Sequence, residues 1–99
     1  MISKLKINEL VALQLVAETG SYSRAGHTIG VQGRVIGVRI ASLETKLGFP
    51  LVDGKPGSIT LTPAGSFYLG RVAEALYVLA EASREAQAIV SGDFDVPYS

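Results

Sequence analysis

The apolar positions near the start of the chain recur at helical spacing and predict a helix over residues 7–19. They fall on two faces, with Leu10, Leu13 and Val16 on one side and Val11 and Leu15 on the other. A helix that is apolar on two sides is buried on two sides. We therefore expect this helix to meet its own core with one face and a further partner with the other.

Two more helices are predicted over residues 22–29 and 33–47. Ser21 is a suitable N-cap for the first of them, because its side-chain oxygen can accept a hydrogen bond from a first-turn amide. Gly48 ends the second, and Gly30 lies in the short turn between the two. Two helices joined by a short turn that contains glycine are typical of a helix-turn-helix.

The helix over residues 33–47 carries two glycines, Gly33 and Gly37, one turn apart and away from its apolar face. Each glycine inside a helix costs about 1 kcal/mol relative to alanine. Two explanations stay open. The bare face lets the helix lie very close to DNA or to another backbone, or it marks a recognition helix that no longer reads bases.

Residues 51–61 predict a two-stranded ribbon, or wing, with Lys55 at its tip. A short strand near Leu51 and a second strand over residues 59–61 flank the turns at Asp53-Gly54 and Pro56-Gly57. Thr62 and Pro63 then begin a helix that continues to about Val90. The predicted organisation is a winged helix-turn-helix domain over residues 1–62, a long helix over 63–90 and a flexible tail over 91–99.

The long helix carries a narrow apolar seam that the rest of the chain is too short to cover. Its residues follow a heptad step of three and four, namely Leu69, Val72, Leu76, Leu79, Ser83, Ala86 and Val90. Such a seam requires a partner helix, so we expect a homodimer. The alternative is a solvated helix that frays at its end.

The composition of the chain argues against several kinds of site and segment. The 99 residues make one domain without cysteine and with His27 as the only histidine, so we expect no metal site and no cofactor. No apolar run approaches the roughly 18 residues of a membrane helix, and no signal peptide is recognisable, so the expected compartment is the cytoplasm. Five basic and two acidic residues lie between Arg24 and Lys55, against two basic and five acidic residues from Pro56 onward. A basic middle segment suits contact with a polyanion.

Three stretches, in the right order and at the right distances, resemble the amino-terminal winged helix-turn-helix of LysR-type transcriptional regulators. They are "LQLVAETGSYSRAGHTIGV", "IASLETKLGFPLV" and "LTPAGSFYLGRVAEAL", and the resemblance covers about residues 7–90. The amino-terminal domain of molybdate-responsive regulators is similar in the same places. The resemblance implies that the long helices of two subunits pair. It also implies a sensor domain just after "AIVSGDFD", where this chain stops, so the chain is either an excised domain or a stand-alone one.

The chain departs from the LysR-type pattern at the recognition helix and at the wing. Gln32, Gly33 and Arg34 stand where the family usually has a Ser-Gln-Pro run, and Gly37 and Val38 replace a serine and an arginine one turn later. The usual Phe-x-Arg of the wing is Val52, Asp53 and Gly54 here, so a phosphate-binding arginine is missing and Lys55 replaces it imperfectly.

The leading hypothesis is a DNA-binding transcriptional regulator, or its DNA-binding domain, that acts as a dimer on a roughly palindromic site. Phosphates would be contacted by Ser21, Ser23 and Lys55, and bases by Gln32 and Arg34, with Arg39 able to do either. Gly33, Gly37 and Val38 would supply contact area on the groove-facing side. Dimerisation would use Val11, Leu15, Leu69, Val72, Leu76 and Leu79.

The alternative is a degenerate winged helix that pairs with or blocks another regulator and reads DNA weakly or not at all. The missing wing arginine, the neutral net charge and the absent sensor domain favour this interpretation. We do not expect an enzyme. The sequence has no nucleophile–base constellation, and its glycines at 30, 33 and 37 do not open a helix after a strand as a phosphate-binding loop requires.

Overall fold

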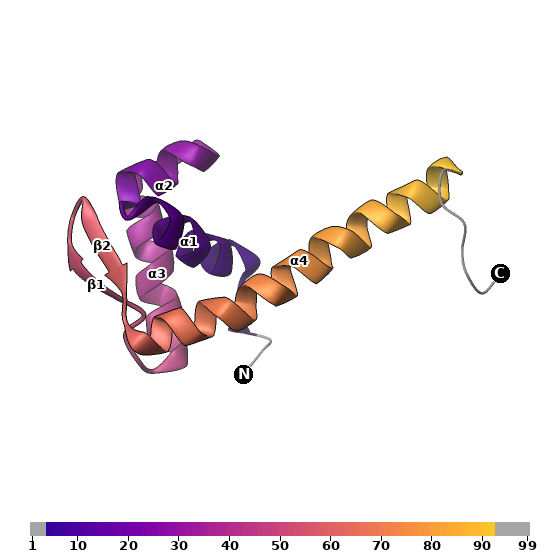
Figure 1. The fold of residues 1–99 in the computed structure, drawn as a ribbon. Coiled ribbons are helices and arrows are strands. Elements are labelled where there is room, and N and C mark those ends of the chain that lie inside the picture. The colour runs from indigo at the N-terminus through magenta and orange to yellow at the C-terminus, as the bar shows by residue number, and fades with distance from the viewer. Residues whose placement is uncertain (1–3, 93–99) are drawn as a thin grey trace.

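A computed structural model describes residues 4–92 of the chain. The elements are α1 (Ile7–Thr19), α2 (Tyr22–Ile29), α3 (Gly33–Leu47), β1 (Val52–Lys55), β2 (Ser58–Leu61) and α4 (Pro63–Ser91). The first three helices and the hairpin form one body, and α4 leaves it as a single long arm (Figure 1). The predicted winged helix-turn-helix followed by a long helix is therefore confirmed, with the first three helices at the predicted bounds.

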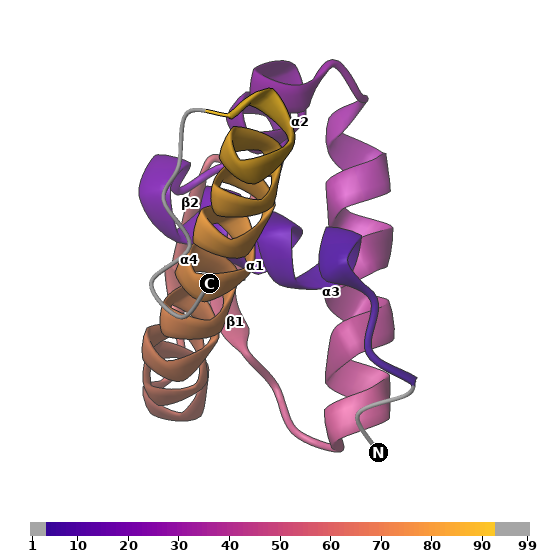
Figure 2. The same ribbon diagram turned by 90° about the vertical axis from the view of Figure 1, so that its right-hand side faces the viewer.

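The core of the body is built around α1, which contacts α2, α3, α4 and β2. Figure 2 shows α1 between α3 and α4. The largest fully buried side chains are Leu13, Val16, Ile36, Ile40, Leu43 and Leu51. Leu13 and Val16 belong to one of the two apolar faces predicted for α1, the next three side chains lie on α3, and Leu51 leads into the wing. Burying each of them stabilises the fold by roughly 1.5–3 kcal/mol.

Local signals in the sequence define the helix ends as expected. The Ser21 side chain accepts a hydrogen bond from the Arg24 amide at 3.3 Å, and Thr62 Oγ1 accepts one from the Gly65 amide at 2.9 Å. Gly65 also lies directly against the Leu51 carbonyl, where a Cβ atom would have no room. This close approach explains why glycine follows Leu-Thr-Pro-Ala at the start of α4.

The wing is an antiparallel pair in which Val52 faces Leu61 and Lys55 faces Ser58. Its first strand differs from the prediction, because Asp53 and Gly54 lie inside β1 rather than in a turn. Gly54 adopts a φ of 106° while it pairs with Ile59, so a glycine that resembles a turn residue in the sequence is a strand residue here. The chain reverses after Lys55, at Pro56 and Gly57.

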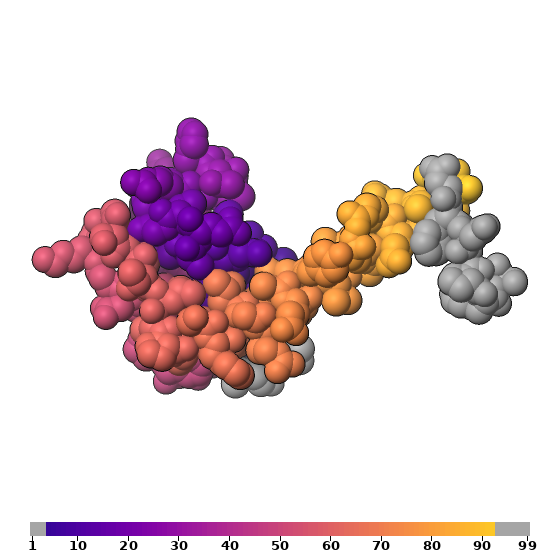
Figure 3. All heavy atoms as spheres, viewed as in Figure 1, coloured from indigo at the N-terminus to yellow at the C-terminus, as the bar shows by residue number. Residues whose placement is uncertain are grey.

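The long helix extends one residue beyond the predicted end, to Ser91, and Gly92 caps it. Its second half projects into solvent well away from the domain body (Figure 3), which gives the molecule a longest extent of 52 Å. Residue 91, predicted as the start of a flexible tail, is therefore helical. The remainder of that prediction, residues 93–99, lies outside the described residues.

A buried ion pair ties the start of α1 to the end of α3. Glu9 is 3% exposed, and its carboxylate lies 2.8 Å from Lys46 Nζ. Ser42 Oγ donates a further hydrogen bond at 2.7 Å, and the Lys6 backbone amide donates one at 3.2 Å. Because these partners come from α3 and from the residue that precedes α1, the carboxylate fixes how α3 is oriented on the body.

We expect this ion pair to make stability depend on pH in the acid range. Burial alone would raise the pKa of Glu9, but Lys46, Ser42 and the Lys6 amide together hold it below its ordinary value of 4.5. The stabilisation is therefore complete above that ordinary value and is lost as the pH falls through the lower pKa of the folded state.

The expected result is a difference in unfolding free energy between wild type and Glu9→Gln that shrinks as the pH is lowered from 7 to 3. Urea unfolding at several pH values measures it. Glu18→Gln is the matched control, because Glu18 is an exposed glutamate of the same helix. A difference between wild type and Glu9→Gln that stays constant over this range would contradict the assignment.

Candidate nucleic-acid interface

The outward face at the start of α3 brings together three of the residues predicted to contact DNA, namely Gln32, Arg34 and Val38. All three are exposed, and Val38 retains 64% of its surface. Arg34 Nε donates a hydrogen bond to Gln32 Oε1 at 3.0 Å. Arg39 does not share this face, because five residues correspond to about 140° around a helix, and its side chain is half-buried.

The two glycines of α3 face α2 rather than outward. A Cβ atom on Gly33 would lie 3.0 Å from the Ser23 backbone nitrogen, and one on Gly37 would lie 3.4 Å from the Tyr22 ring. At Gly33 this supports close approach to another backbone of the same chain, whereas at Gly37 the contact with the Tyr22 ring is an ordinary one. Their predicted place on the groove-facing side is corrected accordingly, and the missing side chain at Gly33 is what lets α2 and α3 pack closely.

The two glycines should respond oppositely to alanine. At Gly33 a Cβ atom meets the backbone of α2, which cannot move without shifting the helix, so we expect Gly33→Ala to destabilise the fold by about 1–3 kcal/mol. At Gly37 the contact with the Tyr22 ring is an ordinary one, so Gly37→Ala should stabilise by up to about 1 kcal/mol. Thermal unfolding of the two variants tests this packing, and equal melting temperatures would contradict it.

At the start of α2, Ser23 and Arg24 are exposed, whereas Ser21 is not. Ser21 is 5% exposed, and its side-chain oxygen is occupied as the N-cap of α2, so the predicted phosphate contact at Ser21 is corrected to a structural role. Ser23 is exposed in the first turn and lies against Gly33.

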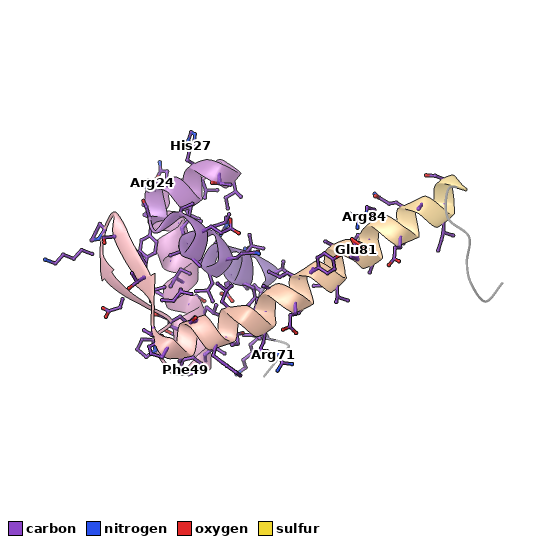
Figure 4. All side chains as sticks on the ribbon, viewed as in Figure 1. Arg24, His27, Phe49, Arg71, Glu81 and Arg84 are labelled. Atoms are coloured by element: carbon purple, nitrogen blue, oxygen red, sulfur yellow. The ribbon has the colours of Figure 1, made fainter. Side chains whose placement is uncertain are left out.

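Arg24 is a candidate that sequence reasoning missed. Its side chain is exposed, and Nη1 donates to the Thr19 carbonyl at 3.3 Å. Figure 4 shows Arg24 and His27 together on α2, pointing away from the domain, while Phe49 and Arg71 lie at the other end. The sequence contained this signal only as one more positive charge in the basic segment.

Ion pairing distinguishes the exposed cations of α2, α3 and the wing from the arginines of α4. Within residues 4–92 the ion pairs are Lys46–Glu9, Arg71–Glu74 and Arg84–Glu81. None of these described pairs involves Arg24, Arg34 or Lys55, which are exposed on α2, on α3 and at the end of β1. Asp53 is the acidic residue of the wing, and its carboxylate accepts a hydrogen bond from the Gly54 amide at 2.8 Å. The exposed cations outside these described pairs therefore lie on the helix-turn-helix and the wing, and also at Lys4 and Lys6 before α1.

The residues predicted for dimerisation are divided between the core and the surface. Val72 is only 8% exposed, and Leu15 and Leu69 pack against the core of their own chain. Val11 and Leu76 are half-buried, and Leu79 is 51% exposed. The prediction that the whole seam is free is thus corrected, because the first half of α4 lies on α1 and only the later half has left the body.

An apolar groove of about 390 Å³ lies where α4 leaves α1. Its lining includes Leu5, Ile7, Leu10, Tyr68, Val72 and Leu79. From α1 the groove is lined by Ile7 and Leu10, and not by the predicted Val11 and Leu15. Tyr77, Val78, Ile89 and Val90 are further exposed apolar residues along α4.

Over residues 4–92 the structure gathers no group of three or more His, Cys, Asp or Glu side chains that could hold a metal ion. None of the described helices combines the length and the apolar character needed to cross a membrane.

Comparison with known proteins identifies similar domains. The sequence model of bacterial regulatory helix-turn-helix proteins of the lysR family matches residues 7–66. An uncharacterized HTH-type transcriptional regulator from the ibpB–leuC intergenic region of Azotobacter vinelandii is 37% identical over 89 residues, which cover 90% of this chain and 61% of that protein. The small neutral protease regulatory protein of Streptomyces coelicolor is 32% identical over 89 residues, covering 90% of this chain and 27% of that protein.

The fold itself recurs in solved structures. A crystal structure of the BenM DBD in complex with catB site 1 DNA superimposes with a TM-score of 0.84 and 21% identity, covering 91% of this chain and 97% of that one. The likeness at this identity concerns the fold alone. The chain spans between about a quarter and three fifths of the length of the two curated relatives.

Proposed function

Because the chain belongs to the lysR family of bacterial regulatory helix-turn-helix proteins, we propose that it binds double-stranded DNA as a homodimer and regulates transcription. The observation that carries this proposal is the set of exposed cations on α2, α3 and the wing that take part in none of the described ion pairs. Family membership confirms the interpretation as a regulatory winged helix-turn-helix. The alternative, a degenerate module that blocks another regulator, is not favoured.

In the proposed complex α3 lies in the major groove, where each base pair presents a distinct pattern of donors and acceptors. Arg34 and Gln32 face the base edges from the exposed side of α3, and Val38 adds apolar contact one turn later. Ser23, Arg24 and Lys55 contact phosphates on either side and hold the register. Arg39, at the flank of α3, is placed for a phosphate rather than for a base.

The second copy of the chain is proposed to cover the apolar groove and the outer half of α4. A long helix whose apolar residues Leu76 and Leu79 remain accessible is stabilised when a partner helix buries them. Two copies also suit a roughly palindromic site, because protein two-fold symmetry is mirrored in paired half-sites.

We further propose that the protein acts by binding rather than by catalysis and that it works in the cytoplasm, where bacterial DNA is accessible to it. The charges on α4 support DNA binding by the helix-turn-helix and the wing rather than by α4. Its surface arginines, Arg71 and Arg84, are paired with Glu74 and Glu81, so this helix attracts a polyanion less than the helix-turn-helix does.

The test is fluorescence anisotropy of the purified chain with labelled duplexes from its own promoter region at two salt concentrations. Electrostatic contacts with phosphates make the logarithm of affinity fall linearly with the logarithm of salt concentration. Lys55→Ala removes one such contact, so we expect weaker binding to all sequences alike and a salt slope smaller by about one unit.

Glu85→Ala is the control for a change of surface charge, because Glu85 is an exposed residue of α4 far from the proposed interface. A wild-type chain that binds no duplex even at low salt would overturn the proposed function. An unchanged salt slope in Lys55→Ala would show that Lys55, at the end of β1, does not contact a phosphate.

A further inference from the structure

Gln32 occupies the N-cap position of α3, but its side chain does not cap the helix. N-cap residues commonly accept a hydrogen bond from a first-turn amide. Here the side-chain oxygen accepts instead from Arg34 Nε, at 3.0 Å, and both side chains remain exposed. The side-chain oxygen of Gln32 is therefore hydrogen-bonded to Arg34 in the protein without DNA.

The chemistry of the two groups determines what they can still offer. A guanidinium Nε can only donate, so the amide atom that faces it is the oxygen and the amide nitrogen keeps both of its hydrogens free. Arg34 keeps both terminal amino groups. The pair therefore presents mainly donors to a ligand, in contrast to a free glutamine, which presents one donor and one acceptor side by side.

An array of donors selects among bases in the major groove. Guanine offers two acceptors there, N7 and O6, and thymine offers O4, whereas adenine and cytosine each carry an amino donor. A free glutamine pairs best with adenine, because its oxygen accepts from N6 while its nitrogen donates to N7. With its oxygen turned to Arg34, Gln32 is poorly placed for this adenine contact.

Resting on the proposed DNA-binding function, we propose that Gln32 is a positioning residue that sets specificity through Arg34. It holds the guanidinium so that the terminal amino groups meet a guanine, and its own amide nitrogen favours guanine or thymine at the neighbouring base. A side chain held in place before binding loses less conformational freedom on binding. Loss of one such hydrogen bond is expected to weaken binding to the preferred site about two- to tenfold.

The test is selection from a randomised duplex library with the purified full chain, followed by affinity measurement on the selected duplex. Wild type should enrich a guanine with guanine or thymine beside it. Gln32→Ala should retain a weaker preference for the guanine and lose the preference at the neighbour. Gln32→Glu keeps an acceptor for Arg34, so it should retain the guanine but move the neighbour toward cytosine, whose amino group a carboxylate accepts from.

A double-mutant cycle separates positioning from independent reading. If Gln32 acts on the guanine through Arg34, the loss of preference for the guanine that Gln32→Ala causes should vanish in the Arg34→Ala background, to within the roughly twofold error of additivity. The loss of the neighbour preference should be the same in both backgrounds. Gln87→Ala, an exposed glutamine of α4, is the control for loss of the side chain itself. The neighbour preference is a readout that a purely structural role for Gln32 would leave unchanged.

Several results would overturn this inference while leaving the proposed function intact. They are additive losses in the cycle, an adenine enriched by wild type and lost in Gln32→Ala, or duplex binding without base preference. A wild-type chain that binds no duplex at all would overturn both the inference and the proposed function.

Discussion

Replacing Leu76 and Leu79 together by aspartate should convert the protein from a dimer into a monomer. Leu76 is half-buried and Leu79 is 51% exposed near the point where α4 leaves α1, and Leu79 also lines the groove beside α1. Burying each leucine stabilises an interface by roughly 1.5–3 kcal/mol. Loss of both corresponds to a dissociation constant that rises at least about 100-fold, before the cost of burying the new charges is added.

Tyr77→Asp with Val78→Asp is the matched control, because it adds the same two charges to exposed apolar positions on another side of α4. Sedimentation velocity at micromolar concentration distinguishes the outcomes. We expect the wild type and the control pair to be dimers and the leucine pair to be a folded monomer with unchanged helix content. A monomeric wild type would contradict the proposed dimer. A monomeric control would show that the interface includes the side of α4 that carries Tyr77 and Val78, and not only the side of the two leucines.

Replacing Arg34 by alanine should lower specific DNA binding by about 5- to 150-fold, because a good bidentate contact with guanine is worth roughly 1–3 kcal/mol of discrimination. The loss should be confined to preferred duplexes and should relax the preference at one base pair in each half-site. Binding to random duplexes should weaken only slightly, since one positive charge is lost.

Arg84→Ala is the matched control, because it removes an arginine that is paired with Glu81 on the far part of α4 (Figure 4). Anisotropy titrations with a selected duplex and a scrambled duplex measure both effects. Equal losses on the two duplexes in Arg34→Ala would show that Arg34 contacts phosphate rather than bases. If Arg34→Ala bound both duplexes as tightly as the wild type, Arg34 would not contact DNA, and the proposed place of α3 in the interface would be contradicted.

Most of the fold could be predicted because its determinants are local. Helical spacing of apolar residues, the cap residues Ser21 and Thr62, and the glycines after each helix define the first three helices and the beginning of α4. The Glu9–Lys46 ion pair could not be predicted, since its partners lie 37 positions apart and neither residue stands out in its own segment.

The candidate interface was harder to predict because residue type does not reveal which way a side chain faces. Gly33 and Gly37 resembled a bare groove-facing stripe, yet they lie against α2. Ser21 resembled a phosphate ligand, but its side chain is buried as the N-cap of α2 and does not face a ligand at the surface. The seam of α4 shows the same limit, because periodicity identifies an apolar face but not the point at which the helix leaves the body. The assignments of DNA contacts to Ser23, Gln32, Arg34, Val38, Arg39 and Lys55 stay predictions.

The central claim is that α3 enters the major groove of DNA, and chemical protection of guanine tests it most directly. Dimethyl sulfate methylates guanine N7, an atom that lies in the major groove, and adenine N3, which lies in the minor groove. On a duplex bound by the wild-type chain we predict protection of guanine N7 in two clusters whose centres are about 10 base pairs, or a multiple of that, apart. Protection should disappear from the guanine of each half-site in Arg34→Ala. Binding that leaves every guanine N7 reactive, or that protects only adenine N3, would contradict the account.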